Sequence, residues 1–446
     1  MEAVEALEGG ETSLADFQHV RGWVEDDSRY EAVPVVGSHR TPTTSMPQEW
    51  IDTLLSGGVI EAVRRADVRG HVLMFGVPEP AKKRWRPIKY TRDANDVLGK
   101  ETLMKLAFPT KQQICDLVHH GDCCIALDFA SYYDQFEYAE DIGRRFCFRV
   151  GGNYYRLRKL AMGQRQAVEV AACTTARLMD FSPRCKTASI IDNVIFVGSR
   201  DDVIRDATAY VERVRAVNAQ LNEDTTDIAA LVQTVCDWGG VHLDFTAKTS
   251  CLAQMTNKAE YSWRNRRAWT WRQFAAHVGL LFWSWQLIQL PMPDFFPLLR
   301  FVSNASAMLA QHDELWDEPA AVWDSAWPAL ERWTLLMLRN APRPVPQELR
   351  PEWLVATDAS EFGWGYFAVH NTTGAVRTHG APWTHEFRRI YGNRVGVSTF
   401  SEPQGVVNSL CHLLRPTEPQ RVRIMTDNTV TQASFQRGYN SRGRPC

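Results

Sequence analysis

The chain has 446 residues, a length that suits two or three domains and excludes a single ordinary domain. Hydrophobic residues make up 45% of it and aromatic residues 11%, which is typical of a globular protein with well-formed cores. The formal net charge of −2 at pH 7 argues against a uniformly basic nucleic-acid-binding protein, although locally basic segments can still bind a polyanion.

The N-terminal segment is acidic, and we expect residues 1–40 to form a weakly ordered leader. It has no apolar signal core, and the ten cysteines of the chain follow no regular spacing. Both features favour a reducing, intracellular setting, in the nucleus or the cytoplasm, over secretion. The most apolar run, residues 278–290, is short and contains two glutamines, so it predicts a buried helix and no membrane span.

The following part of the chain alternates between helical and strand-like patterns. Residues 146–160 alternate in polarity around Gly151-Gly152-Asn153, which is a hairpin signal. A second apolar strand at 189–197 is interrupted by Asp192 and Asn193. The other elements predicted here are a helix at 110–120, a strand at 123–128, a helix at 166–179, a helical region at 203–238, a strand at 241–252 and a Trp-rich, largely helical region at 263–340.

A cluster of four prolines between residues 342 and 351 cannot sustain a helix and predicts a stiff linker. Beyond the linker lies another α/β pattern. Its predicted elements are strands at 353–358, 364–370, 395–400 and 421–426, with helices at 401–414 and 428–437.

Two aspartates interrupt apolar strands. Asp128 ends one predicted strand, and Asp192 lies inside another. A carboxylate in an apolar strand is costly unless a partner neutralises it. If the two strands are neighbours, both acids meet at one point of a sheet, where a pair of Mg²⁺ ions could activate a 3′-hydroxyl group and stabilise the leaving pyrophosphate. A lone Asp more often caps a turn, so neither residue decides the question by itself.

Five segments between residues 82 and 252 resemble the motifs of reverse transcriptases, in the same order. Asp128 and Tyr133 in LDFASYYDQF have the spacing of the family's Asp and the aromatic residue that follows it. The segment ASIIDNVIFVG occupies the place of the family's Y-x-D-D hairpin. The other three are KKRWRPIKYTRDAN, which resembles the fingers segment, FRVGGNYYRLRKLAMGQRQAVEVA, which resembles the strand-turn-strand and LPFG segment, and WGGVHLDFTAKTSCL, which resembles the segment that carries a lysine.

This resemblance implies an RNA-directed DNA polymerase that uses Mg²⁺, or Mn²⁺ in its place. Asp128 and Asp192 would bind the metal, and the ring of Tyr133 would fill the space that a ribose 2′-hydroxyl group needs. The expected partners are dNTPs, an RNA template and a DNA primer, and no membrane. The alternative for Tyr133 is a core aromatic residue, against which its offset of five residues from Asp128 counts.

Three further positions match residues that contact the substrate in the family. Arg86 would contact the triphosphate, since a guanidinium fork suits phosphate oxygens. Gly163 would let the backbone lie close to the incoming nucleotide. Lys248 occupies the position of the family's lysine.

The hairpin departs from the family pattern. Asn193 replaces the second Asp of the pair, and Ile190 replaces the usual Tyr. In this family the first Asp is the firmer metal ligand, so Asp192 can sustain activity, but an amide carries no charge and metal affinity should fall. A catalytically lapsed protein that still binds nucleic acid or acts as a scaffold is therefore the alternative function. An RNA-dependent RNA polymerase is a third alternative, which Tyr133 and the C-terminal region disfavour.

Three basic stretches with interleaved aromatic residues suit a template-primer groove, because cations neutralise phosphates and aromatic rings stack on bases. Any one such stretch is more often a solvated face. They run from Lys82 to Arg92, from Arg144 to Lys159 and from Trp263 to Arg272.

The C-terminal pattern carries a second set of acids. The segment WLVATDASEFGWGYFAV resembles the first strand pair of RNase H, with Asp358 as its opening acid. Glu402 begins the helix after the third predicted strand, and Asp427 follows the fourth. In that family the acids gather two Mg²⁺ ions to hydrolyse RNA paired with DNA, so an RNA–DNA hybrid is an expected partner. The family's last strand and helix are not seen before Cys446, and we expect a C-terminally incomplete domain.

His119, His120, Cys123 and Cys124 have the chemistry of zinc ligands at close spacing. A zinc site normally needs four converging donors, commonly with a second spaced pair elsewhere, and no such pair is apparent. The two cysteines also begin the strand that carries Asp128, where small thiols pack well. We therefore expect no zinc site here.

Together these patterns predict an α+β protein: a right-hand polymerase with fingers, palm and thumb, followed by a truncated RNase H-like α/β domain. The expected domains are the leader at 1–40, fingers and palm at 41–262, a helical thumb or connection at 263–345 and the RNase H-like domain at 346–446. The direct joining of these parts resembles a retrotransposon polyprotein with a role in transposition and DNA integration. Details such as AKTSCL and DAS-x-x-GWG are similar to the tyrosine-recombinase group (DIRS and VIPER-like elements).

Overall fold

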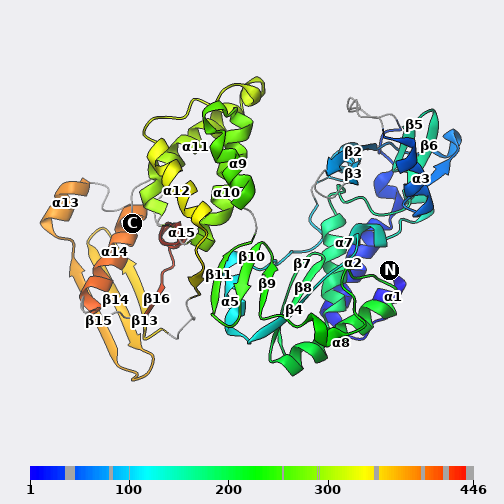
Figure 1. Ribbon diagram of the computed structural model, residues 1–446. Helices are drawn as coiled ribbons and strands as arrows, with labels where there is room; N and C mark the ends of the chain where they lie inside the picture. Colours follow the sequence, from blue (N-terminus) through cyan, green and yellow to red (C-terminus); the bar gives the residue numbers. More distant parts are fainter. Residues whose placement is uncertain are drawn as a thin grey trace. The chain divides into compact units, whose positions relative to one another are not determined.

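The computed structural model describes the chain except for residues 36–45, 80–83, 100, 254–255, 289, 291, 346–350, 393–396, 415–420 and 438–446. The chain divides into two compact units, Met1–Ala253 and Gln254–Cys446 (Figure 1). Each unit contains both helices and strands, so the fold is of a mixed class. In the described ranges, no helix combines the length and apolarity that crossing a lipid bilayer requires.

Helices form much of residues 1–35, which departs from the weakly ordered leader expected at residues 1–40, of which 36–40 lie outside the described residues. Helix α1 (Glu2–Glu5) is followed by α2 (Glu11–Val24), which packs on α7 (Ala167–Leu178). The reason is that Phe17, Val20 and Trp23 recur at helical spacing among the acidic residues and are buried on one face of α2.

Two small antiparallel sheets follow. Strands β1 (Ile60–Val63), β6 (Asn153–Leu157) and β5 (Cys147–Val150) form the first, and β2 (Leu73–Glu79) pairs with β3 (Arg84–Tyr90) in the second. The predicted hairpin at 146–160 is confirmed. Its turn uses Gly151 and Gly152 at φ 56° and 93°, a left-handed conformation that costs glycine little. Three helices belong to the same part of the chain: α3 (Gln48–Ser56) precedes β1, α4 (Arg92–Leu98) follows β3, and α6 (Glu140–Gly143) precedes β5.

The central sheet of the first unit has the order β4–β8–β7, with all neighbours antiparallel. Strand β4 (Cys123–Asp128) is the strand expected at 123–128, and α5 (Lys111–Asp116) precedes it with a capping box at Thr110. Strands β7 (Lys186–Ile190) and β8 (Asn193–Gly198) form a hairpin. Asp192 therefore lies in a two-residue turn and not inside a strand, because the apolar run at 189–197 folds back on itself.

Helices α7 and α8 (Arg200–Ala216) contact the strands of this sheet and bury Phe196 and Tyr210 in a shared core. The helix expected at 203–238 ends much earlier. Asn218 adopts φ 55°, a conformation that commonly terminates helices, and the polar, turn-favouring residues 222–227 follow. Beyond them, β9 (Val235–Trp238), β10 (Val241–Asp244) and β11 (Thr249–Leu252) pair as an antiparallel sheet.

The second unit begins with helices, as predicted for residues 263–340. They are α9 (Thr256–Arg264), α10 (Trp271–Ile288), α11 (Phe296–Leu309) and α12 (Trp327–Arg339). His277 of α10 is fully buried between the hydroxyl groups of Ser262 and Thr334, and burial lowers its pKa to about 4. A two-residue strand, β12 (Arg343–Pro344), lies in the predicted proline linker, part of which falls outside the described residues.

The rest of the second unit contains a sheet of order β15–β14–β13–β16, with α14 (Ser398–Leu413) packed against β13 and β14. Strands β13 (Trp353–Ala359) and β14 (Gly363–His370) are antiparallel, and β16 (Val422–Met425) runs parallel to β13. Helices α13 (His385–Tyr391) and α15 (Thr429–Arg437) complete it.

The third strand of this sheet was placed wrongly by the sequence pattern. It is β15 (Val376–Pro382), an edge strand with mostly exposed residues and therefore without apolar alternation. Of the predicted strand at 395–400, residues 395 and 396 fall outside the described ranges, and 398–400 begin α14. Glu402 accordingly lies in the second turn of α14 and not at its start.

Candidate functional site

Asp128 and Asp192 lie at the same end of the central sheet. Asp128 is the last residue of β4 and is paired in register with Asn193, the first residue of β8. Asp192 immediately precedes that residue in the β7–β8 turn. Its carbonyl oxygen accepts a hydrogen bond from the N–H of Phe129 at 3.3 Å, and, after burial, its negative charge is the next largest cause that raises the pKa of the Asp128 carboxyl group. The two acids that the sequence singled out are therefore electrostatic neighbours.

The turn that carries Asp192 is held in an unusual conformation. Ile191 has φ 57°, which is rare for a β-branched side chain and marks local strain. The hydroxyl group of Thr175 on α7 donates a hydrogen bond of 2.6 Å to the Ile191 carbonyl oxygen. The hydroxyl groups of Thr175 and Tyr132 lie 2.9 Å apart, within hydrogen-bond distance. This chain of contacts supports the strained turn and with it the position of Asp192.

The carboxyl group of Asp128 is suited to a cation. Burial raises its pKa most, and the negative charges of Asp192 and Glu223 raise it further. Its Oδ1 atom is buried and has no hydrogen-bond partner within the described part of the chain. An orphaned carboxylate oxygen beside other carboxylates fits a divalent ion with oxygen ligands, such as Mg²⁺.

Two neighbours of Asp128 were missed by the sequence analysis. The side-chain amide of Asn222 donates a hydrogen bond of 2.9 Å to Asp128 Oδ2, and the Asp128 N–H donates one of 3.0 Å to Glu223 Oε2. Both residues belong to the polar segment that was expected to be helical. No spacing rule links this segment to Asp128, so only the folded chain brings them together.

Tyr133 lies in the short 3₁₀ helix Tyr132–Gln135 that follows β4, and its ring is half-buried. Burial raises the pKa of its hydroxyl group, and the charge of Asp192 raises it further. Tyr133 therefore lies within electrostatic reach of Asp192, and its ring packs against the hydrophobic cores on both sides.

Arg86, Gly163 and Lys248 are the other three residues that were expected to contact the substrate, and each lies in a different environment. Arg86 is exposed on β3. A Cβ atom at Gly163 would lie 2.6 Å from the Lys89 carbonyl oxygen, so the close approach that requires glycine here is to β3. The Lys248 ammonium group donates to the Gly121 carbonyl oxygen at 2.9 Å.

The basic stretches are largely engaged within the protein. Side chains of the first stretch are described only from Arg86 onward, where buried Lys89 forms an ion pair with Asp134. In the second stretch, Arg145 pairs with Asp27 at 2.9 Å, and other arginines have similar acidic partners.

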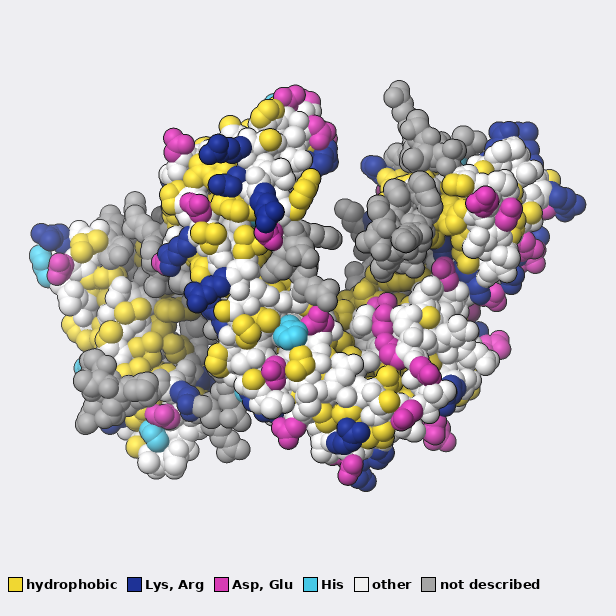
Figure 2. Space-filling view, in the orientation of Figure 1, with side chains coloured by type: hydrophobic (Ala, Val, Ile, Leu, Met, Phe, Trp, Pro, Cys, Tyr) yellow, Lys and Arg dark blue, Asp and Glu magenta, His cyan; other side chains and the backbone are white. Residues whose placement is uncertain are grey.

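The tryptophans of the third stretch do not offer free faces for base stacking. Trp263, Trp269 and Trp271 are between 4% and 8% exposed and form the core of the helical region. Their arginines stay at the surface, where Arg272 pairs with Asp317 at 2.9 Å. Figure 2 shows Lys and Arg side chains mixed with acidic and apolar side chains over the region of α9 to α12.

A second acidic cluster lies at the end of the sheet in the second unit. Asp358, Glu402 and Asp427 offer carboxylate oxygens that lie within 4.8 Å of one another. Asp358 and Asp427 each stand two residues beyond the parallel pair Ala356 and Met425, so strand register alone places them side by side. The three acids predicted from the sequence are thus brought together.

Glu402 is the buried member of this cluster, with 6% of its surface exposed. Burial raises its pKa, and the charges of Asp358 and Asp427 raise it further. Its Oε2 atom has no hydrogen-bond partner among the described residues. Gly405 permits this placement, because a Cβ there would lie 3.0 Å from the Ala359 Cβ and would push α14 away from β13. Three carboxylates with one orphaned oxygen fit a divalent ion.

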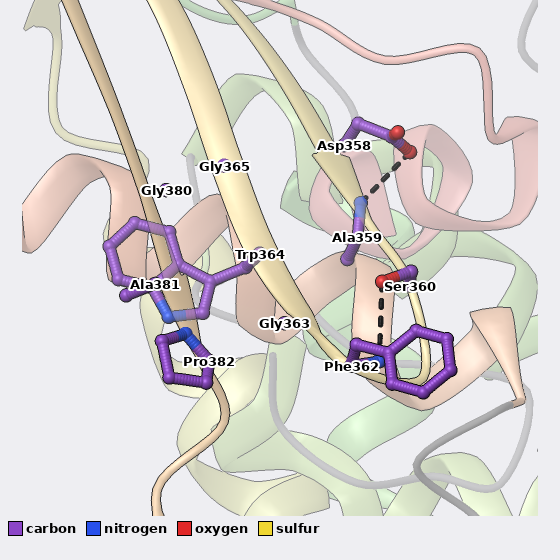
Figure 3. A pocket seen from close by; sticks show the side chains of 10 residues that line it. All are labelled: Asp358, Ala359, Ser360, Phe362, Gly363, Trp364, Gly365, Gly380, Ala381 and Pro382. Carbon is purple, nitrogen blue, oxygen red and sulfur yellow. Dashed lines mark hydrogen bonds between the residues drawn. The ribbon is translucent and has the colours of Figure 1, made fainter.

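A hollow of about 460 Å³ adjoins the cluster (Figure 3). Asp358 lies at one edge, and glycines 363, 365 and 380 add no side chains to a lining that includes Phe362 and Trp364. Phe362 is 69% exposed. Of the three acids, Asp358 therefore lines this open hollow.

Comparisons with known proteins give a similarity of fold. No protein-family profile matches the chain, and no curated protein sequence matches it. Among solved structures, the foamy viral protease-reverse transcriptase dRH in complex with dsDNA is similar, with a TM-score of 0.54 and 12% identity over 90% of this chain and 66% of that one. The foamy viral protease-reverse transcriptase in complex with dsDNA is also similar, with a TM-score of 0.50 and 11% identity over 96% of both chains. The fold of the chain is similar to that of these viral reverse-transcriptase structures.

A third solved structure, the foamy viral protease-reverse transcriptase in complex with an RNA/DNA hybrid, gives a TM-score of 0.50 and 12% identity over 89% of this chain and 56% of that one. At such identity, the reverse-transcriptase-like fold is a statement about architecture alone. The chain spans less than two thirds of two of these three structures.

Proposed function

We propose that the protein is an RNA-directed DNA polymerase that adds dNTPs to a DNA primer at Asp128 and Asp192. The observation that carries this proposal is the meeting of these two acids at one end of the central sheet, where Oδ1 of Asp128 has no hydrogen-bond partner among the described residues. The reverse-transcriptase-like fold and the order of the sequence motifs support it. In this proposal, the first unit holds fingers and palm, and the helices that follow act as a thumb.

Each residue has a defined task in the proposed reaction. Asp128 and Asp192 would hold Mg²⁺, which when bound activates the primer 3′-hydroxyl group and stabilises the pyrophosphate leaving group. Tyr133 would exclude a ribose 2′-hydroxyl group by the bulk of its ring. Arg86 would neutralise the triphosphate, and Lys248 would support the adjoining segment at Gly121.

The second acidic cluster supports a proposed RNase H-like activity. Asp358, Glu402 and Asp427 would hold divalent ions and direct water against the RNA strand of an RNA–DNA hybrid. The motif details further support an origin in a tyrosine-recombinase retrotransposon, a proposal that rests on the sequence alone.

Primer extension on an RNA template tests the polymerase proposal. Wild type should extend a labelled DNA primer with dNTPs and Mg²⁺, and Asp128→Ala should not. Glu212→Gln, which removes an exposed carboxylate on α8, is the matched control and should extend as wild type does. Equal extension by wild type and Asp128→Ala would exclude this site.

The alternative is a catalytically lapsed protein that binds nucleic acid. Asn193 favours it, because the residue paired with Asp128 carries an amide and lies 3.4 Å from Asp192 Oδ1. This alternative predicts salt-sensitive binding to an RNA–DNA hybrid without incorporation in Mg²⁺ or Mn²⁺. A large gain of activity in Asn193→Asp would favour decay of an ancestral enzyme, and unchanged wild-type activity would favour tolerance of the amide.

A further inference from the structure

The segment that follows α8 runs alongside the end of β4. Leu221 and Phe129 form an antiparallel bridge, and the Ala130 N–H donates a hydrogen bond of 3.0 Å to the Gln220 carbonyl oxygen. Strand β8 lies on the opposite side, where Asn193 pairs with Asp128. Asp128 is thus flanked on one side by the β7–β8 hairpin and on the other by residues 220–223.

Asn222 contacts both the backbone and the side chain of Asp128. Its N–H donates a hydrogen bond of 2.8 Å to the Asp128 carbonyl oxygen, and its side-chain amide donates one of 2.9 Å to Asp128 Oδ2. The same amide reaches the Phe129 carbonyl oxygen at 3.3 Å. Glu223 accepts a hydrogen bond from the Asp128 N–H. Asp128 is therefore held at its nitrogen, at its carbonyl oxygen and at one carboxylate oxygen.

This arrangement distinguishes the two oxygens of the Asp128 carboxylate. Oδ2 is occupied by the Asn222 amide, and buried Oδ1 has no hydrogen-bond partner in the ranges that the structure describes. A carboxylate that can rotate freely loses rotational entropy when it binds a cation, whereas one held by an amide is already oriented. The Asn222 side chain is exposed, and its hydrogen bonds to Asp128 Oδ2 and to the Phe129 carbonyl oxygen fix its direction.

We propose that Asn222 is a positioning residue, which holds Oδ2 of Asp128 so that Oδ1 is presented to a divalent cation. This inference rests on the proposed polymerase function. It assigns to Asn222 an outer-shell role of the kind that commonly changes metal affinity by about 10–100-fold when it is removed. Such a role is distinct from stabilising the fold, because it acts on one carboxylate rotamer.

Localised cleavage by bound Fe²⁺ separates these roles. In the apo full-length chain with ascorbate and peroxide, Fe²⁺ at the first site should cut the backbone near residues 128 and 192, and Fe²⁺ at the second should cut near 358 and 427. The second site is an internal reference for loading and chemistry. The variants are Asn222→Ala and, as a matched control, Gln220→Ala. The Gln220 side chain is exposed, and its removal leaves the backbone hydrogen bonds between residue 220 and the Gln135 side chain in place.

Asn222→Ala should need about tenfold more Fe²⁺ to cut near residues 128 and 192, with unchanged cleavage near 358 and 427. Gln220→Ala should match wild type at both places. The Mg²⁺ concentration for half-maximal primer extension should rise by a similar factor in Asn222→Ala, with the dNTP dependence unchanged. A thermal unfolding midpoint equal to that of Gln220→Ala checks that the variant folds.

Wild-type affinity for Fe²⁺ and Mg²⁺ in folded Asn222→Ala would overturn the positioning role while leaving the polymerase proposal standing. Wild type that is cut near 358 and 427 but not near 128 and 192 would instead remove the first cation site, and the proposed function with it. A single cleavage experiment therefore distinguishes failure of the positioning role from failure of the proposed function.

Discussion

The Thr175 hydroxyl group and the Ile191 carbonyl oxygen are joined by a hydrogen bond of 2.6 Å that connects α7 to the turn before Asp192. Thr175 is 1% exposed, so a lost donor would not be replaced by bulk water. The strained φ of Ile191 depends on such external support.

Thr175→Val keeps the shape of the side chain and removes the donor. We expect a loss of about 1–3 kcal/mol in the free energy of unfolding, because the Ile191 carbonyl oxygen loses its partner. Primer extension should fall as well, since Asp192 shifts with the turn. Urea denaturation and single-nucleotide incorporation measure the two effects. Thr174→Val is the control, because the Thr174 hydroxyl group donates a hydrogen bond of 2.8 Å within α7, to the Val170 carbonyl oxygen.

Replacement of Tyr133 tests its proposed role as a gate. Tyr133→Ala should raise rNTP incorporation relative to dNTP incorporation by about tenfold or more, a change of about 1.4 kcal/mol in discrimination. Tyr133→Phe keeps the ring and should keep the discrimination. The measurement is kcat/KM for matched dNTP and rNTP pairs, and unchanged selectivity in Tyr133→Ala would refute the gate.

The pKa of Glu402 determines a pH dependence of stability in the absence of divalent ions. Its folded-state pKa is raised above the ordinary value of 4.5, so the ionised carboxylate costs folding free energy once the pH exceeds 4.5. Glu402→Gln should therefore unfold at higher denaturant than wild type at pH 7, and the difference should vanish below pH 4.5. Glu386→Gln, at an exposed position on α13, should show no such difference.

Addition of Mg²⁺ should reverse this relation. A cation that binds only the folded cluster stabilises wild type in proportion to its concentration, and Glu402→Gln should respond less. A variant that gains as much stability from Mg²⁺ as wild type does would argue against Glu402 as a ligand.

The buried tryptophans predict a stability effect where the sequence had indicated base stacking. Trp269→Ala should cost about 3–5 kcal/mol of unfolding free energy, because the side chain is 4% exposed and packs against Trp263 and His277. Trp323→Ala, at a residue 42% exposed, should cost clearly less. Chemical denaturation of the two variants compares them directly.

The sequence was sufficient where chemistry and local pattern coincide. Asp128 is the last residue of β4 and Asp358 the last but one of β13, and parallel register then places Asp427 beside Asp358. It was insufficient where placement depends on tertiary pairing. Strand β15 lies at a sheet edge and is mostly exposed, so its sequence carries no alternation.

Asn222 shows the same limit at the site itself. Its segment follows α8 by chain connectivity, but its position beside Asp128 arises from pairing between residues 94 positions apart. The burial that turns tryptophans 263, 269 and 271 into core residues likewise depends on how three helices meet, which periodicity does not specify.

The central claim is that Asp128 and Asp192 act as one cation-binding unit, and the rate of single-nucleotide addition tests it most directly. Asp128→Asn, Asp192→Asn and the double variant are compared with wild type on an RNA template at saturating Mg²⁺. We predict that each single variant loses about 10²–10³-fold or more, and that the double variant loses little beyond either one. Wild-type rates in either single variant, or losses that multiply in the double variant, would contradict the claim.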